Sequence, residues 1–287
     1  MRRRLALTVA ILLVTGVAVS GNTVSDEDKQ GITAAALGYM DGALDSDAAR
    51  VAEATHPELT KVALLAFPDA SGTGLRKMGH SQLVEIVRAK ATHLEPEKRN
   101  IEVEIFDARE GIASAKVVSS MYYDYLQLAR VDGQWTILNV LWTPNAPAEE
   151  GGPTAEDRKK DEEGIRGAAL DYLEGFFTGD AERMARGLHP ELTKVSPRAL
   201  PPDGKTFLDK VGAGLLVAYT GTKRGLLAED KRAIEIEIYD VNGDIATAGA
   251  MSAMFYDYLQ LARIDGRWQI VNVLWTMNPS APQREQK

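Results

Sequence analysis

The stretch YYDYLQLARVDGQWTILNVLWT, residues 122–143, decides the fold of this chain. Residues 122–131 and 134–143 are expected to form two strands. Asp132 and Gly133 join the two runs, and an Asp-Gly pair between such runs indicates a tight turn, because glycine accepts the positive φ that the turn requires. The stretch therefore predicts a β-hairpin.

The same stretch returns 133 residues later as FYDYLQLARIDGRWQIVNVLWT, residues 255–276. Around it, residues 98–143 match 231–276 at 29 of 46 positions. Near the start of each copy, residues 31–62 match 164–195 at 18 of 32 positions. A period of this size is that of a whole domain, so each copy is expected to have its own core. The chain is predicted to be a tandem duplication.

The duplication places the first domain at 25–143 and the second at 157–277. Residues 144–156 carry proline, glycine and charge but almost no large apolar side chain, which is typical of an exposed linker. Each copy has helical patterns first and strand patterns after, which predicts an α+β domain. In the first copy we expect helices over 25–43, 47–54 and 82–91, and strands over 101–105 and 113–117 before the hairpin.

The N-terminus has the pattern of an export signal. Arg2, Arg3 and Arg4 precede an apolar stretch of 15 residues, and Ala18 and Ser20 supply the small residues of a cleavage site. A spanning helix needs about 20 apolar residues, which favours a signal peptide over 1–20 rather than a retained anchor. The sequence predicts a secreted or periplasmic protein without stable membrane insertion after cleavage.

Composition excludes several classes of site. The chain carries 33 Lys and Arg against 41 Asp and Glu, for a net charge of −8, which opposes binding to nucleic acid. It has no cysteine, which excludes disulfides, thiolate metal sites, cysteine nucleophiles and a lipid-modified N-terminal cysteine. Each copy repeats only one histidine, and no pair of histidines has the spacing of a helical metal site. We expect neither a metal nor a cofactor.

Three motifs present in both copies resemble the putative lumazine-binding family of the nuclear transport factor 2-like superfamily. They are Tyr-x-Asp/Glu-Gly with an aspartate a few residues on, His-Pro-Glu-Leu, and Asp-Tyr-Leu-Gln-Leu-Ala-Arg-x-Asp-Gly-x-Trp-x-Ile-x-Asn. The resemblance implies two tandem cone-shaped domains. In each cone, N-terminal helices pack on a strongly bent antiparallel sheet that surrounds a pocket. The motifs lie at 39–58, 124–139, 172–191 and 257–272.

The resemblance also implies how the two copies associate. Members of the superfamily often form homodimers through their sheets, so we expect the linked copies to pair within the chain as a pseudo-dimer. A linker of roughly fifteen residues reaches about 50 Å when extended, and it holds the second domain at an effective concentration of order millimolar. Pairing within the chain is geometrically easy.

Ketosteroid isomerases, polyketide cyclases and small dehydratases belong to the same superfamily. Tyr39 and Tyr172 each lie eight residues before an aspartate, a spacing similar to that of the oxyanion tyrosine of the isomerases. At the position of the isomerases' general base, this chain has Ala63 and Ser196. Neither side chain can accept a proton near neutral pH, so steroid-type isomerisation is not expected.

Asp124 and Asp257 are candidate acid–base groups. Each shares a strand face with two leucines, so the alternation of the strand points the carboxyl into the cone. Burial there would raise the pKa of an unpaired carboxyl. The alternative, which we favour, is a carboxylate satisfied by backbone or tyrosine hydrogen bonds.

His56 and His189 are the histidines that both copies keep. A histidine near the aspartate could form a proton-transfer dyad with it. The favoured alternative is a residue at a helix terminus that binds carbonyl oxygens ahead of Pro57 or Pro190.

Aromatic residues are candidates for the wall of a pocket for a flat ligand, although such residues more often form plain core. Phe255 stands where the first copy has Tyr122, so one hydroxyl is lost and the two pockets are expected to differ. Together with Asp124 and Asp257, the candidate ligand-binding residues are Tyr39, Tyr122, Trp142, Tyr172, Phe255 and Trp275.

Three functions remain open. The leading hypothesis is a non-catalytic protein that binds a small apolar or aromatic molecule. The rival is an acid–base enzyme of the cyclase, dehydratase or isomerase type that uses Asp124, His56 and Tyr39; it requires the first two within about 2.6–3.2 Å, or one water, of each other. The third is an interaction scaffold whose cones are filled by side chains.

Overall fold

The computed structural model describes residues 24–66, 72–145, 152–201 and 204–281. The signal peptide expected over 1–20 and most of the expected linker lie outside these residues. Among the described helices, none has the length and apolar character needed to cross a membrane.

Within the described residues, each copy folds into three α-helices, a 3₁₀ turn and six strands. The first copy contains α1 (Asp26–Asp45), α2 (Ala48–Ala54), β1 (Thr55–Ala66), β2 (Thr73–Gly79), α3 (His80–Arg88), η1 (Pro96–Lys98), β3 (Glu102–Arg109), β4 (Ile112–Val118), β5 (Tyr122–Val131) and β6 (Gln134–Pro144). The second contains α4 (Ala155–Thr178), α5 (Ala181–Gly187), β7 (Leu188–Leu200), β8 (Lys205–Gly212), α6 (Ala213–Gly221), η2 (Glu229–Lys231), β9 (Glu235–Asn242), β10 (Ile245–Met251), β11 (Phe255–Ile264) and β12 (Arg267–Met277).

The two sheets have the same topology, with strand orders β2-β1-β6-β5-β4-β3 and β8-β7-β12-β11-β10-β9. The expected hairpin is β5 and β6, and its turn holds Asp132 and Gly133 at φ 48° and 88°. The expected antiparallel sheet contains one parallel pairing in each copy, because β1 runs parallel to β6, as β7 does to β12. The reason is that β1 and β2, which the sequence pattern did not indicate, extend the sheet beyond β6, with β1 next to it.

The core of each cone lies between the first helix and the concave face of the sheet. Ile32, Ala36 and Tyr39 on α1 are buried in one cluster with Leu126 and Leu128 of β5. The helix starts where Ser25 accepts a hydrogen bond from the Asp28 amide at 3.1 Å. The apolar face of α1 is therefore aimed into the cone.

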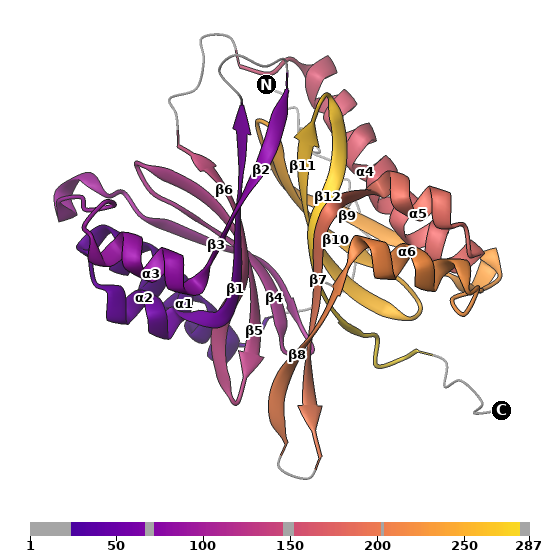
Figure 1. Ribbon diagram of the computed structural model, residues 1–287, viewed down its shortest axis with the longest axis horizontal. Coiled ribbons are helices and arrows are strands. Elements are labelled where there is room, and N and C mark those ends of the chain that lie inside the picture. The colour runs from indigo at the N-terminus through magenta and orange to yellow at the C-terminus, as the bar shows by residue number, and fades with distance from the viewer. Residues whose placement is uncertain (1–23, 67–71, 146–151, 202–203, 282–287) are drawn as a thin grey trace, which may run out of the picture.

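The two copies meet through the opposite faces of their sheets. Figure 1 shows the helices on the two outer flanks and the sheets between them. Tyr125 and Leu141 of the first copy pack with Ile245 and Val271 of the second, and all four are buried. This face alternates with the one that lines the cone, so a single strand serves both the cone and the interface.

Hydrogen bonds across the interface occur in symmetry-related pairs. Gln127 donates to the Tyr258 carbonyl at 2.7 Å, and Gln260 donates to the Tyr125 carbonyl at 2.8 Å. The two glutamines are 133 residues apart, the period of the duplication. The copies are thus arranged as a pseudo-dimer inside one chain.

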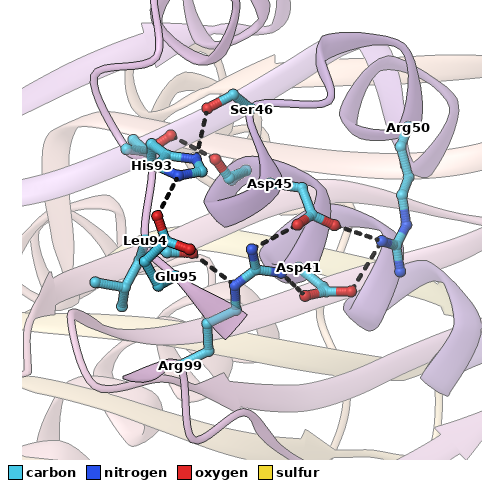
Figure 2. Close-up of polar contacts among 10 residues, drawn as sticks. Asp41, Asp45, Ser46, Arg50, His93, Leu94, Glu95 and Arg99 are labelled. Carbon is cyan, nitrogen blue, oxygen red and sulfur yellow. Dashed lines mark hydrogen bonds and ion pairs between the residues drawn. The ribbon is translucent and has the colours of Figure 1, made fainter. Parts of the chain in front are cut away.

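An ion network holds the C-terminal end of α1 against the chain that leads to β3 (Figure 2). Arg99 donates to Asp41 at 2.7 Å and pairs with Asp45 at 2.5 Å. Arg50 of α2 binds the same two carboxylates at 2.8 and 3.4 Å. Because α1 carries Tyr39, this network helps to fix the helix that supplies the cone with its tyrosine.

Gly164 lies at a close contact between helix α4 and Trp268 of the sheet. A Cβ at this position would lie 2.6 Å from Cδ1 of Trp268, so Gly164→Ala is expected to cost about 1–3 kcal/mol in the free energy of unfolding. Gly167 on the same helix has no such neighbour within 4 Å, and Gly167→Ala is expected to be neutral or stabilising by up to about 1 kcal/mol. Urea unfolding of both variants measures the difference, and equal effects would contradict this packing.

Candidate functional site

A buried triad of Tyr39, Lys61 and Asp124 lies inside the first cone. Tyr39 donates its hydroxyl hydrogen bond to Oδ2 of Asp124 at 2.5 Å. Lys61 donates to the Tyr39 hydroxyl at 2.5 Å and to the same carboxylate oxygen at 2.9 Å. All three residues are buried, and Asp124 has no exposed surface.

Three elements supply the triad. Tyr39 projects from the buried face of α1, Lys61 from β1 and Asp124 from β5. As expected from the strand alternation, Asp124 is buried on the face of Leu126 and Leu128. The carboxylate has the tyrosine partner foreseen in the favoured alternative, and in addition a lysine.

Aromatic rings surround the lysine. Nζ of Lys61 lies 4.6 Å from the centroid of the Trp142 ring, within the range of a cation–π interaction. Tyr122 meets Trp142 edge to face, with centroids 5.5 Å apart, and both rings are only partly buried. The aromatic candidates of the first copy therefore gather on one side of the triad.

The second cone repeats the arrangement with Tyr172, Lys194 and Asp257. Tyr172 donates to Oδ1 of Asp257 at 2.7 Å, and Lys194 binds that oxygen at 2.6 Å and also the tyrosine hydroxyl. Nζ of Lys194 lies 4.5 Å from the Trp275 ring, whose edge-to-face neighbour is Phe255. The loss of one hydroxyl at Phe255 leaves the triad unchanged.

Burial controls the protonation of the triad. It raises the pKa of Tyr39 well above its usual value, and the negative charge of Asp124 adds to this. Burial lowers the pKa of Lys61, while the same carboxylate acts in the opposite direction. Tyr172 and Lys194 shift in the same directions for the same causes. Near neutral pH each tyrosine is therefore a hydrogen-bond donor.

One oxygen of each carboxylate has no partner. Oδ1 of Asp124 and Oδ2 of Asp257 are buried and accept no hydrogen bond from the described residues. A buried acceptor without a donor costs free energy, and such groups are rare in folded proteins. Both cones thus contain a buried carboxylate oxygen that no described residue binds.

His56 and His189, the histidines that both copies keep, form hydrogen bonds away from the triads. Nδ1 of His56 accepts from the Glu58 amide at 3.0 Å, and Nδ1 of His189 accepts from the Glu191 amide at 3.1 Å. Burial lowers the pKa of both rings. Each ring accepts from the amide two residues further along its own strand. Among the described residues, neither histidine makes a hydrogen bond to Asp124 or Asp257 of the kind a dyad needs, and neither binds a carbonyl oxygen.

Clefts lie outside the cones. One of about 480 Å³ runs beside Gly31, Gly38 and Trp135 between α1 and the turn of the β5–β6 hairpin. A cleft of about 590 Å³ occupies the corresponding place beside Trp268. Neither is lined by a triad residue. Within the described parts of the chain, no group of three potential metal-binding side chains occurs.

The lysine is the site residue that the sequence pattern did not single out. Both copies contain Leu-Thr-Lys-Val, at 59–62 and 192–195, directly after the repeated His-Pro-Glu. Without a predicted strand at this position, Lys61 looks like an ordinary exposed lysine. The sequence signal that could have identified Lys61 is the presence of the same lysine in both copies, near the end of a segment in which the copies match well.

Comparison with known families covers both copies. The model of a family described as putative lumazine-binding matches residues 27–143 and 160–276. The chain belongs to this family. Both triads fall within the matched ranges.

This member of the putative lumazine-binding family carries two copies of the family's domain in one chain. A protein of unknown function from Shewanella baltica is 18% identical, over 44% of this chain and 100% of its own, with a TM-score of 0.35. One from Methylobacillus flagellatus is 22% identical, over 44% and 98%, with a TM-score of 0.34. A ketosteroid isomerase-like protein from Erwinia carotovora atroseptica is 15% identical, over 43% and 100%, at 0.32. No curated protein matches the chain.

Proposed function

We propose that the chain is an exported, non-catalytic protein that binds one small, flat molecule in each of its two cones. Its N-terminal residues have the pattern of a cleaved signal peptide, which supports export to the periplasm or the medium. The two sites lie in one chain, and the packing of the two sheets holds them together.

The unpartnered carboxylate oxygen carries the proposal. Oδ1 of Asp124 is buried beside a protonated tyrosine and a lysine, and the ion pair leaves the triad without net charge. A ligand that donates one hydrogen bond satisfies this oxygen, while the rings of Trp142 and Tyr122 provide a surface for stacking. The site therefore favours a neutral aromatic molecule with an N–H or O–H group on its edge.

Native mass spectrometry of protein purified from its own source tests this proposal. We expect a mass of one chain with up to two small molecules. The paired substitution Lys61→Met with Asp124→Asn removes the charges of one triad together and is expected to leave one molecule bound. Lys194→Met with Asp257→Asn is the matched variant for the second cone.

The outcomes separate the open functions. A bare chain under conditions that preserve the fold would contradict ligand binding and favour an interaction scaffold. Two molecules retained in either paired variant would place binding outside the triads, for example in the clefts beside Trp135 and Trp268.

An acid–base enzyme is the second candidate, favoured by the direct hydrogen bond between the Tyr39 hydroxyl and the buried carboxylate of Asp124. It would act without His56, whose ring contacts the Glu58 amide instead. Incubation of the bound molecule with the protein in D₂O distinguishes the two candidates. Protein-dependent deuterium on carbon would indicate proton abstraction, and unchanged mass is expected of a binding protein.

A further inference from the structure

The interface between the two copies contains equivalent carboxylates that are bound by different cations. Asp107 of β3 and Asp240 of β9 lie 133 residues apart and hold the same register in their sheets. Directly before them in sequence, Phe106 and Tyr239 stack on each other across the interface, with ring centroids 5.4 Å apart. Because these rings are equivalent residues in contact, they mark the axis that relates the copies, and the two aspartates are their sequence neighbours.

Asp107 takes its cation from its own copy. Arg109, two residues further along β3, binds the carboxylate at 2.6 Å, and the aspartate side chain is 9% exposed. The second copy adds a neutral donor, the Tyr258 hydroxyl, at 2.9 Å. The first copy therefore neutralises its own carboxylate and needs no charge from a partner.

Asp240 takes its cation from the other copy. Nζ of Lys116, on β4, binds this carboxylate across the interface at 3.0 Å, and the Tyr123 hydroxyl of the first copy donates to it as well. The side chain of Asp240 is 23% exposed, so water screens the ion pair only in part. The second copy has Asn242 where the first has Arg109, and it therefore lacks the cation on its own strand.

The second copy also lacks the lysine. Its residue at the position of Lys116 is Gly249, and a Cβ there would collide with the hydroxyl of Tyr239. In the first copy, Phe106 has no hydroxyl, and Nζ of Lys116 lies 5.6 Å from its ring centroid. The copies therefore differ at two neighbouring positions together. One has a lysine beside a phenylalanine, and the other has a glycine beside a tyrosine.

Other basic residues near Asp240 do not replace this ion pair. Arg263 lines a cleft with Asp240, but it binds Asp161 and Asp244 at 2.7 and 2.6 Å. Arg158 lines the same cleft, is exposed, and makes no ion pair with Asp240 among the described residues. The cleft brings no surplus of positive charge, because three acidic residues besides Asp240 line it.

Lys116 has a second partner, which lies in its own copy. Glu104 binds Nζ at 2.9 Å, and its side chain is 58% exposed. An exposed carboxylate is solvated by water without a partner, so this pair contributes little. The contact that matters for pairing is therefore the one with Asp240.

We propose that Lys116 determines which copies pair. It supplies across the interface the cation that the second copy lacks, so the sheet of a second copy fits a first copy and not another second copy. This selectivity is independent of any ligand in the cones.

The selectivity follows from the balance of charge. In the observed pair, each of the two aspartates has one cation. If two chains exchanged copies, a pair of first copies would hold both Arg109 and Lys116 for each Asp107, and a pair of second copies would hold neither. The second of these pairs makes the exchange unfavourable, because a carboxylate taken out of water without a countercharge costs free energy.

Hydrogen exchange of the chain from Gly21 onward tests the proposal on peptides that cover β10. Lys116→Met leaves Asp240 without a cation and is expected to raise the exchange rates of these amides about tenfold. Glu104→Gln removes the exposed partner of the same lysine and is the matched control. Its rates are expected to stay within about twofold of the wild type.

Two further variants separate the charge of Lys116 from its packing. Lys116→Met with Asn242→Arg gives Asp240 an arginine at the position from which Arg109 binds Asp107. The exchange rates are expected to return to within about threefold of the wild type, although the lysine is still absent. Lys116→Met with Asp240→Asn removes the unpaired charge instead, and it is expected to exchange more slowly than Lys116→Met alone.

A pair of second copies can be imitated in the intact chain. Arg109→Asn with Lys116→Met gives the first copy the charge pattern of the second, so both aspartates lack a cation. Exchange is expected to be about a hundredfold faster than in the wild type. Addition of Asn242→Arg supplies one of the two missing cations and is expected to recover about tenfold of this loss.

Two results would overturn the proposal. Wild-type exchange rates in Lys116→Met would show that Asp240 does not need a cation from the other copy. If neither Asn242→Arg nor Asp240→Asn slowed the exchange of Lys116→Met, the lysine would act through packing alone, and the interface would not select its partner by charge.

Discussion

Lys61→Met is expected to lower the free energy of unfolding by about 3–5 kcal/mol, because it leaves the carboxylate of Asp124 buried without its countercharge. The ion pair is 2.9 Å long and almost fully enclosed. Tyr39 still donates to the carboxylate in the variant, but a neutral hydroxyl does not replace the ammonium group. Urea unfolding followed by circular dichroism measures the loss.

The control for this prediction removes both charges. In Lys61→Met with Asp124→Asn, the asparagine oxygen still accepts from Tyr39, and the expected cost falls to about 1–2 kcal/mol. A double variant less stable than the single one would show that the lysine and the aspartate do not stabilise each other. The account of the triad would then be wrong.

Tyr258→Ala is expected to destabilise the whole chain by about 3–5 kcal/mol, since it opens a cavity between the two sheets. Tyr258 has no exposed surface, and it packs against Ile112 and Leu138 of the other copy. Its hydroxyl donates to Asp107 of the first copy at 2.9 Å. The ring therefore stabilises both copies at once.

Hydrogen exchange measured on peptides from both copies checks this coupling. We expect protection to fall in the first and the second copy together, because their sheets share one buried interface. Tyr258→Phe keeps the ring and loses one hydrogen bond to Asp107, which still pairs with Arg109 at 2.6 Å, so its cost is expected to be about 1–2 kcal/mol. Loss of protection confined to the second copy would contradict a common unit.

The sequence predicted those parts of the fold whose hydrophobic periodicity or turn residues were clear. The hairpin of β5 and β6, the turn at Asp132 and the burial of Asp124 all follow from alternation and turn chemistry. Strand β1 was missed because Thr55–Ala66 begins with Thr-His-Pro-Glu directly after a helix, and because its parallel partner β6 lies far away in sequence. Local patterns carry little information about such pairing.

The missed strand also explains the missed lysine. A lysine is normally exposed, and only its place on β1, opposite Tyr39 and Asp124, makes Lys61 a site residue. Conversely, His56 was a candidate by residue type, but its ring turns to the Glu58 amide. Pairing between strands that are distant in sequence therefore decides which side chains meet inside the cone, and the local His-Pro-Glu-Leu motif does not.

Small-angle X-ray scattering of the chain from Gly21 onward tests most directly whether the duplication forms one body of two paired cones. A single compact unit of this length is expected to have a radius of gyration of about 18 Å and the mass of one chain. A clearly larger radius with a two-lobed distance distribution, or the mass of two chains, would contradict the account.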